Sequence, residues 1–249
     1  MREWVYGRNP VYETLRAKRR QPFLLRLAHG VQEKGRLGDI VRLCEARKVP
    51  VEHVPRSQLD SLVPNHQGAA LEVSGYRYAH LADILERAEQ RGEPPFTLVL
   101  DTLQDPQNLG TLLRTAEISG VHGVLLPHRR TATVTPAVVN ASSGASEHLL
   151  IARVNLAQAI ERLKEQDVWV YGLEDSSEAK LPNQLDLDGP LALVVGNEAE
   201  GIRPLVRSSC DLFLRLPMGG QIDSYNAAVA GSIALFLVWQ TRGFRGAHD

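Results

Sequence analysis

The chain of 249 residues has little cysteine and no long apolar run. Its two cysteines, Cys44 and Cys210, have no second Cys or His nearby at metal-ligand spacing, so the sequence supports neither a zinc site nor a disulfide framework. No apolar run approaches the ~20 residues that span a bilayer. The first residues, from Met1 to Trp4, lack the apolar core of a signal peptide. We therefore expect a cytoplasmic protein that uses no metal.

Two glycine motifs of nucleotide-binding proteins are also missing. No G-x-G-x-x-G follows the first strand of the later part of the chain, and no G-x-x-x-x-G-K-[ST] occurs anywhere. These absences disfavour ordinary dinucleotide chemistry and phosphate-loop chemistry. A dehydrogenase-like nucleotide enzyme stays only a remote alternative.

The net charge of −1 hides an uneven distribution of charge. Residues 1–56 contain 13 Lys and Arg against 6 Asp and Glu, whereas the rest of the chain is acidic. A basic first part favours contact with a polyanion, above all nucleic acid. The alternative is a basic face that is merely solvated.

The pattern of apolar residues divides the chain into two parts. Residues 1–75 are typical of a small α/β domain, with helices expected at 11–20, 38–48 and 57–62 and strands at 23–28, 49–54 and 69–73. Residues 76–95 form a charged helical linker that ends in a Gly/Pro cluster. Residues 96–249 form the second domain.

Strands and helices alternate in this second domain. The strand candidates are nearly continuous apolar runs, at 97–100, 123–126, 149–154, 168–173, 191–195 and 212–216. Such runs indicate a mostly parallel sheet covered by helices on both faces. The helix candidates lie at 109–119, 136–141, 156–166, 202–208 and 225–240. The last of these is apolar nearly all round, so it is expected to be buried or in a subunit interface.

Three of these strands end in polar turns. The first turn carries Asn108, Gly110 and Arg114, the second carries Gly196 and Glu198, and the third carries Ser224 and Asn226. Ligands of parallel sheets bind beyond the carboxyl ends of the strands, so we expect the three turns to form one pocket. The alternative is purely structural: Asn108 caps its helix, Arg114 pairs with Asp101 or Asp105, and Ser224 and Asn226 cap the last helix.

The spacing of these turns resembles the three motifs of the SpoU (TrmH) family of RNA ribose 2′-O-methyltransferases, in the SPOUT superfamily. The matching segments are Asn-x-Gly-x-x-x-Arg-Thr-Ala from Asn108, Gly-Asn-Glu-x-x-Gly from Gly196, and Leu-Pro-Met from Leu216 followed by Ser-x-Asn from Ser224. The segment Tyr-Gly-Arg-Asn-Pro from Tyr6 and the turn His-Gln-Gly from His66 resemble the ribosomal RNA branch. The resemblance spans almost the whole chain.

The resemblance implies a fold, a reaction and a site. It implies a catalytic domain with a deep trefoil knot, preceded by an L30e-like RNA-binding domain, and a homodimer formed through the C-terminal domain. It implies S-adenosylmethionine-dependent 2′-O-methylation of a guanosine ribose in 23S rRNA, in the peptidyl-transferase region. The catalytic set would be Asn108, Arg114, Glu198, Ser224 and Asn226. The cofactor would bind at Gly196, Leu216, Met218 and Tyr225.

The same reading assigns roles to single residues. Arg114 is expected to hold the target phosphate and stabilise charge at the hydroxyl, since a guanidinium resists deprotonation. Glu198 would orient Arg114 or accept a proton. The basic first domain would bind folded RNA through its phosphates. The candidate contacts are Arg8, Arg16, Lys18, Arg19 and Arg20.

One departure from the family pattern leaves alternatives open. The third motif of the family usually reads Ser-Leu-Asn-Val-Ser, whereas here Tyr225 replaces Leu and Ala228 replaces the second Ser. A non-catalytic RNA-binding paralogue is one alternative. A transfer RNA methyltransferase is another, although the long N-terminal domain argues against it.

Overall fold

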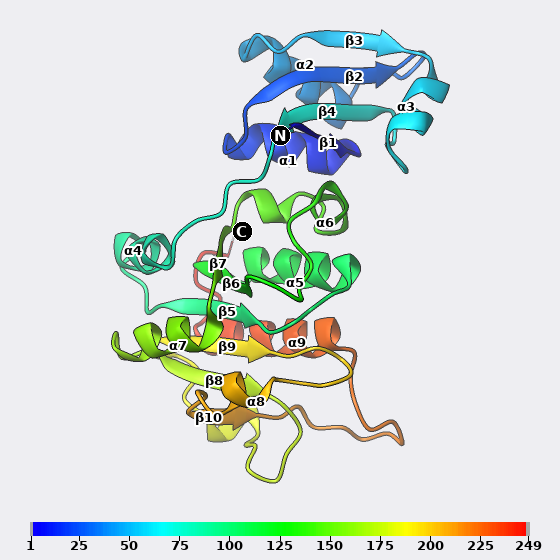
Figure 1. Ribbon diagram of the computed structural model, residues 1–249. Helices are drawn as coiled ribbons and strands as arrows, with labels where there is room; N and C mark the ends of the chain where they lie inside the picture. The colour runs from blue at the N-terminus through cyan, green and yellow to red at the C-terminus, as the bar shows by residue number, and fades with distance from the viewer. Residues whose placement is uncertain (1, 248–249) are drawn as a thin grey trace. The chain divides into compact units, whose positions relative to one another are not determined.

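The computed structural model describes residues 2–247, which form two compact units. The first unit holds the chain up to Arg77 together with Thr133–His148, and the second holds Tyr78–Ala132 and the chain from Leu149 onward (Figure 1). Residues 133–148 therefore belong to a different unit from the residues that flank them. The domain limits expected from the sequence stay a prediction.

The first unit is built on a four-stranded sheet in the order β1-β4-β2-β3. Its strands are β1 (Arg2–Tyr6), β2 (Pro22–Ala28), β3 (Val51–Val54) and β4 (Ala69–Ser74). Its helices are α1 (Arg8–Ala17), α2 (Arg36–Ala46), α3 (Arg56–Leu62), α6 (Pro136–Ala141) and the 3-10 turn η1 (Ala145–Glu147). Strand β4 runs antiparallel to both β1 and β2, whereas β2 and β3 are parallel. The sheet is therefore mixed.

Helix α1 and strand β1 differ most from the sequence prediction for the first unit. Helix α1 spans Arg8–Ala17 rather than 11–20, because Lys18 adopts a left-handed conformation (φ 56°) that ends the helix. Strand β1 was not predicted, since its first three residues are only partly buried or exposed and give no clear alternation. It forms by pairing with the distant β4.

The second unit contains one sheet of six strands, all parallel, in the order β10-β8-β9-β5-β6-β7. The strands are β5 (Phe96–Leu100), β6 (Gly123–Pro127), β7 (Leu150–Val154), β8 (Trp169–Leu173), β9 (Leu191–Val195) and β10 (Leu212–Leu214). Each lies where an apolar run predicted a strand. Strands β5, β6 and β9 are buried along their whole length, as expected for strands covered on both faces.

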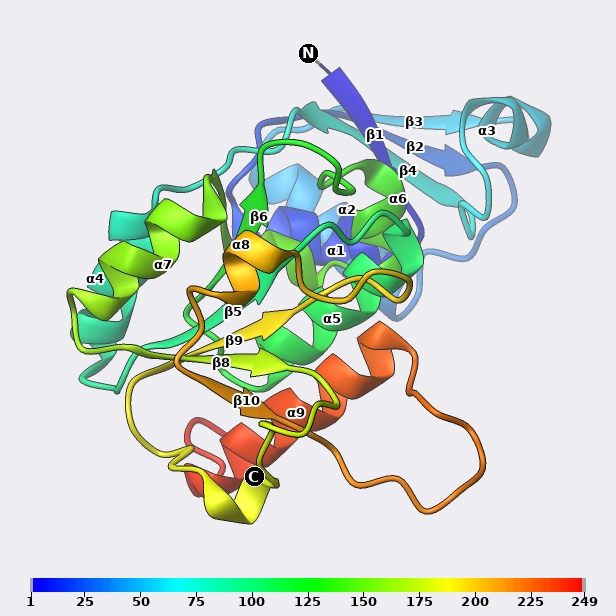
Figure 2. The same cartoon turned by 60° about the horizontal axis from the view of Figure 1, so that its bottom comes forward.

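Helices cover both faces of this sheet (Figure 2). On one face, α4 (Leu81–Arg91), α7 (Leu156–Lys164) and α8 (Pro204–Arg207) share a hydrophobic core with strand residues such as Val99 and Val194. On the other face, α9 (Ala227–Thr241) packs against α5 (Pro106–Ile118) and against β8 and β9. The remaining element is the 3-10 turn η2 (Pro182–Gln184). The fold is thus α/β, as predicted.

Helices α5 and α9 approach closely because a glycine lies between them. A Cβ on Gly231 would stand 2.5 Å from the side chain of Leu112, so with a larger residue either Leu112 or α9 would have to shift. A hydrogen bond of 2.9 Å between the hydroxyls of Thr115 and Ser232 joins the same pair of helices. The two helices that carry the first and third polar turns are therefore held together.

No helix of residues 2–247 combines the length and the apolar character that crossing a membrane requires. The most apolar one, α9, has 15 residues.

Candidate active site

The structure brings the three polar turns into direct contact. Asp105 caps α5 by accepting a hydrogen bond from the backbone amide of Gln107 (3.0 Å), which leaves the side chain of Asn108 free for another role. The Asn108 amide donates to a carboxylate oxygen of Glu198, in the second turn. The amide of Asn226, in the third turn, donates to Oδ1 of Asn108 over 3.4 Å. Asn108 therefore joins all three turns, and the structural alternative, in which Asn108 only caps its helix, is wrong.

The second turn folds back on itself after β9. A Cβ on Gly196 would lie 2.2 Å from the backbone carbon of Gly201, so only glycine fits there. The Asn197 side chain accepts hydrogen bonds from the amides of Ala199 (2.9 Å) and Glu200 (2.7 Å). These bonds close a tight loop and present Glu198 to solvent next to α5.

The third turn is held by α9 and by the segment after β10. Asn226 caps α9 by accepting hydrogen bonds from the amides of Ala228 (3.0 Å) and Val229 (3.2 Å). The Tyr225 hydroxyl donates to the carbonyl of Pro217 over 3.2 Å. The aromatic residue that departs from the family pattern thus ties the two ends of segment 217–225 to each other. Ser224 is exposed.

A pocket of about 300 Å³ lies among these turns. All four residues predicted to bind the cofactor line it, and so do the predicted catalytic residues Glu198, Ser224 and Asn226. Asn108 does not line the pocket but contacts it through Glu198. Arg114 is exposed on α5 and is not among the lining residues. The four lining residues predicted for the cofactor are Gly196, Leu216, Met218 and Tyr225.

Sequence reasoning missed the residues that follow β8. Leu173, Glu174 and Asp175 line the same pocket, at the carboxyl end of a strand for which no polar turn motif was recognised. The rule that ligands bind beyond strand ends could have found them. The pocket is lined by four carboxylates, those of Glu174, Asp175, Glu198 and Asp223, and by no Lys or Arg. One of them, Glu174, forms an ion pair of 2.8 Å with Arg207, which lies outside the lining. The pocket therefore suits a cationic ligand better than a phosphate-bearing one.

A partly buried ion pair joins the residue Arg203, just after the second turn, to the end of β5. Asp101 is fully buried and accepts hydrogen bonds from the backbone amide of Arg203 (2.8 Å) and from its Nε (2.7 Å). A backbone hydrogen bond of 2.8 Å also joins the Asp101 amide to the carbonyl of Val195. The carboxylate of Asp101 thus anchors the start of α8.

Metal and thiol chemistry find no support in the described part of the chain. Residues 2–247 contain no group of three or more His, Cys, Asp or Glu side chains that could hold a metal ion. Burial raises the pKa of Cys44 to about 11 and that of Cys210 to about 12, so neither forms a thiolate nucleophile near neutral pH.

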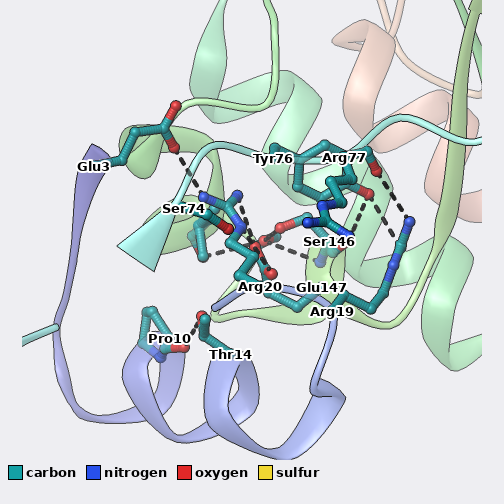
Figure 3. Close-up of polar contacts among 12 residues, drawn as sticks. Glu3, Pro10, Thr14, Arg19, Arg20, Ser74, Tyr76, Arg77, Ser146 and Glu147 are labelled. Atoms are coloured by element: carbon teal, nitrogen blue, oxygen red, sulfur yellow. Dashed lines mark hydrogen bonds and ion pairs between the residues drawn. The ribbon is translucent and has the colours of Figure 1, made fainter. Parts of the chain in front are cut away.

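The five basic residues predicted to contact RNA differ in exposure. Arg8, Arg16 and Lys18 are exposed, and Arg16 forms only a 3.5 Å surface ion pair with Glu13. Arg19 is partly buried, and it donates to the Tyr76 hydroxyl and to the carbonyl of Arg77 (Figure 3).

Arg20 lies in the interior of the first unit. Its Nε and Nη2 contact the two carboxylate oxygens of Glu147, at 3.1 and 2.9 Å, while Nη1 contacts Glu3 at 2.8 Å (Figure 3). Burial raises the pKa of Glu147, and the Arg20 charge opposes this shift. Because the guanidinium is buried and paired, we leave Arg20 out of the proposed RNA contacts.

Comparison with known proteins identifies the family. The model of the SpoU rRNA methylase family matches residues 95–236, and a model named RNA 2′-O ribose methyltransferase substrate binding matches residues 4–79. The chain belongs to the SpoU rRNA methylase family. The second match covers most of the first unit, and the first covers the six-stranded sheet with its three turns.

Individual relatives agree with this assignment. The chain is 40% identical over 242 residues, 96% of each chain, to the Bacillus subtilis protein YacO, which is assigned to the TrmH family of tRNA/rRNA methyltransferases. A relative from Staphylococcus aureus with the same family assignment is 39% identical over 219 residues, 87% of this chain and 86% of its own.

Solved SpoU-family structures share the fold. The SpoU methyltransferase AviRb from Streptomyces viridochromogenes, in complex with AdoMet, has a TM-score of 0.81 at 21% identity, over 98% of this chain and 91% of its own. An AdoMet-bound rRNA methyltransferase from Sinorhizobium meliloti has a TM-score of 0.77 at 24% identity, over 96% of this chain and 87% of its own.

Proposed function

We propose that this SpoU-family protein transfers a methyl group from S-adenosylmethionine to the 2′-hydroxyl of a guanosine ribose in 23S rRNA, in the peptidyl-transferase region. The observation that supports the reaction best is the contact of Asn108 with both Glu198 and Asn226 at the edge of one pocket. Three segments far apart in the sequence thereby form one polar site. The choice of ribosomal RNA rests on the N-terminal motifs and on the match to a substrate-binding domain.

The pocket fits the proposed cofactor in size and in charge. Its volume of about 300 Å³ lies in the range of small-molecule sites. S-adenosylmethionine carries a positive sulfonium, and the lining supplies four carboxylates without a basic side chain. A nicotinamide dinucleotide carries phosphates, which the same carboxylates would repel. The pocket thus argues against the dehydrogenase-like alternative.

The residues of the site align and activate the ribose hydroxyl. When bound, S-adenosylmethionine supplies the methyl group in electrophilic form. Arg114 holds a phosphate of the RNA and stabilises negative charge that develops at the hydroxyl, while Glu198 orients it or accepts the proton. Asn108 keeps Glu198 in place through its amide, and Ser224 and Asn226 hold the third turn. Alignment alone contributes on the order of 7–11 kcal/mol to such a reaction.

Methyl incorporation into RNA tests the function directly. Purified protein, labelled S-adenosylmethionine and either 23S rRNA or a tRNA pool should give ribose methylation of a 23S guanosine, located by mass spectrometry. Methylation of tRNA alone would support the tRNA alternative. Calorimetry that detects no cofactor binding would support the non-catalytic paralogue.

Arg114 provides a separate test of the catalytic set. Arg114→Ala should lower turnover about 100-fold or more, because oxyanion-type stabilisation is worth that much. Its affinity for S-adenosylmethionine should stay close to wild type, since Arg114 does not line the pocket. Turnover that survives this change would contradict the assignment. Arg162→Ala, at an exposed position of α7, is the matched control.

We further propose that the protein is a homodimer formed through α9. Three apolar residues at helical spacing, Val229, Ile233 and Phe236, are exposed on this helix, and Phe236 packs beside Trp239 and Phe244. Soluble monomers rarely leave such a contiguous apolar face open to water. A second copy of α9 would cover it.

In the first unit, we propose that the exposed Arg8, Arg16 and Lys18, with the partly buried Arg19, contact RNA phosphates. Such contacts make binding strongly dependent on salt. The unpaired thiols Cys44 and Cys210 also favour the reducing cytoplasm as the compartment.

A further inference from the structure

A second pocket lies in the sheet unit, at the carboxyl ends of β6 and β7. Its volume is about 650 Å³, and it shares no residue with the pocket described above. We call it the β6–α8 pocket. It is lined by Pro127, His128, Arg129, Arg130, Asn155, Leu156, Ala157 and residues Arg203 to Val206. None of these residues belongs to the three polar turns, so the proposed reaction leaves the pocket without a role.

The charge of the β6–α8 pocket is positive. His128, Arg129 and Arg130 follow β6 directly and are exposed. Within residues 2–247, neither Arg129 nor Arg130 has a carboxylate at ion-pair distance, and no Asp or Glu lines the pocket. Arg203 is the exception among the basic lining residues, because Asp101 neutralises it at 2.6 Å. Two guanidinium groups are therefore available to an anion.

Other residues that line the pocket are apolar. Leu205 on α8 is 68% exposed, and Pro204 beside it is exposed as well. Leu156 and Ala157 at the start of α7 continue this surface. A pocket lined by both guanidinium groups and apolar side chains offers contacts for the two parts of a nucleotide, its phosphate and its base. Proteins that bind single-stranded nucleic acid combine the same two features.

Hydrogen bonds and a short chain segment connect the pocket to the proposed active site. Arg203 lies two residues beyond Gly201, which lines the first pocket, and its backbone amide is bound by the buried Asp101 at the end of β5. The end of β6 is braced too, because Arg153 of β7 donates a hydrogen bond to the carbonyl of His128. Both of these parts of the β6–α8 pocket are thus joined to the ends of strands in the same sheet as the active site.

We propose that the β6–α8 pocket binds an unpaired nucleotide of the substrate RNA that flanks the methylated one. This inference rests on the proposed function. Arg129 and Arg130 contact its phosphates, and Leu205 with Pro204 contacts its base. The site gives the sheet unit an RNA contact of its own, in addition to the basic residues of the first unit.

Paired variants test the phosphate contacts. The double variant Arg129→Ala/Arg130→Ala is compared with Arg91→Ala/Arg162→Ala, which removes the same charge from exposed positions outside the pocket. The probe is the 23S rRNA fragment that the wild type methylates. The pocket variant should raise KM for this RNA at least tenfold and lower the slope of log affinity against log salt by about 0.7 per lost phosphate contact. The control pair should change KM less than twofold.

Leu205→Ala tests the base contact. It should weaken RNA binding several-fold while the salt slope stays that of the wild type, because no charge is removed. In both variants calorimetry should give wild-type affinity for S-adenosylmethionine, which shows that the fold and the first pocket are intact.

The failure of this inference differs from the failure of the proposed function. If the wild type methylates no RNA, the proposed function is wrong. If the wild type is active but Arg129→Ala/Arg130→Ala matches the control pair in KM and salt slope, the β6–α8 pocket does not bind substrate. A wild-type affinity for RNA in Leu205→Ala would remove the base contact.

Discussion

At the scale of single residues, Gly196 shows how one backbone position shapes the site. The chain returns so closely on itself between Gly196 and Gly201 that the backbone fills the space of any side chain. Gly219, in the segment after β10, has open space around its Cα. Packing therefore requires glycine at position 196, whereas position 219 has room for a side chain and can serve as the matched control.

We predict that Gly196→Ala destabilises the protein and weakens its cofactor binding. The added methyl group forces the second turn to open, at a cost of roughly 1–3 kcal/mol for overpacking. Gly219→Ala should change the free energy of unfolding by less than about 0.5 kcal/mol. Urea unfolding and calorimetry with S-adenosylmethionine measure both effects. Equal behaviour of the two variants would contradict the role given to Gly196.

The residues of the pocket were largely predictable, whereas their mutual contacts were not. Gly and Asn after apolar strands indicated where the turns lie, but nothing in the sequence showed that Asn108 binds Glu198, 90 residues away. The position of Arg20 also could not be predicted. It follows two other basic residues, which suggests a surface cluster, yet its partner Glu147 lies 127 residues further along the chain.

At the scale of elements, the parallel strands followed from their apolar runs and the helix ends did not. Helix α5 begins at Pro106 rather than 109 because Asp105 caps it and Pro suits the first helical turn. Helix α8 covers only Pro204–Arg207 of the expected 202–208, since the preceding residues are bound by Asp101 and by the second turn. Such ends depend on tertiary contacts that local sequence patterns do not contain.

The start of β5 depends on the protonation state of one histidine. Nδ1 of His122 accepts a hydrogen bond from the backbone amide of Phe96 (3.0 Å), and Nε2 lies 2.9 Å from a carboxylate oxygen of Glu93. A nitrogen that accepts cannot carry a proton, so the neutral ring is the one that fits. Burial lowers the pKa of His122 below its ordinary value of 6.5, although the hydrogen bond to Glu93 opposes this shift.

We predict that stability falls as pH drops below about 6.5, in part through His122. His122 takes up a proton more readily in the unfolded chain than in the folded one. The stability that the neutral ring of His122 contributes is therefore present above the unfolded pKa and is lost on acidification. In His122→Asn, Oδ1 can still accept from Phe96 without titrating. Its free energy of unfolding should depend less on pH between 5.5 and 7.5 in urea titrations. A slope equal to that of the wild type would exclude His122 as the cause.

At the scale of the whole molecule, the exposed face of α9 predicts self-association. Phe236→Glu should convert the dimer into a monomer at micromolar concentration, because a carboxylate cannot be buried unpaired in an apolar interface. Light scattering after size-exclusion chromatography measures the mass. Leu205→Glu, which places the same charge on an exposed apolar residue of α8, should leave the dimer intact. A monomeric wild type would refute the proposal.

Breaking the buried pair of Arg20 and Glu147 should strongly destabilise the first unit. Glu147→Ala leaves a guanidinium buried without its bidentate partner, and such losses cost about 3–5 kcal/mol. Arg16→Ala, which removes only an exposed ion pair, should cost less than about 1 kcal/mol. Thermal unfolding of Glu147→Ala and of Arg16→Ala measures the two losses of stability. The double change Arg20→Met/Glu147→Leu should recover most of the loss, which separates the unpaired charge from general disruption.

This pair also has a consequence for dissecting the protein. The chain passes between the units after Arg77, after Ala132 and after His148, so no single cut separates them. A fragment that starts near residue 95, where the family model begins, would retain Glu147, Val138 and Val139 but lose the sheet of residues 2–74 that shelters them. In such a fragment, the apolar side chains of Val138 and Val139 and the carboxylate of Glu147 would be exposed to solvent. A truncation meant to isolate the methyl-transferring half should therefore also replace residues 133–148 with a short polar loop.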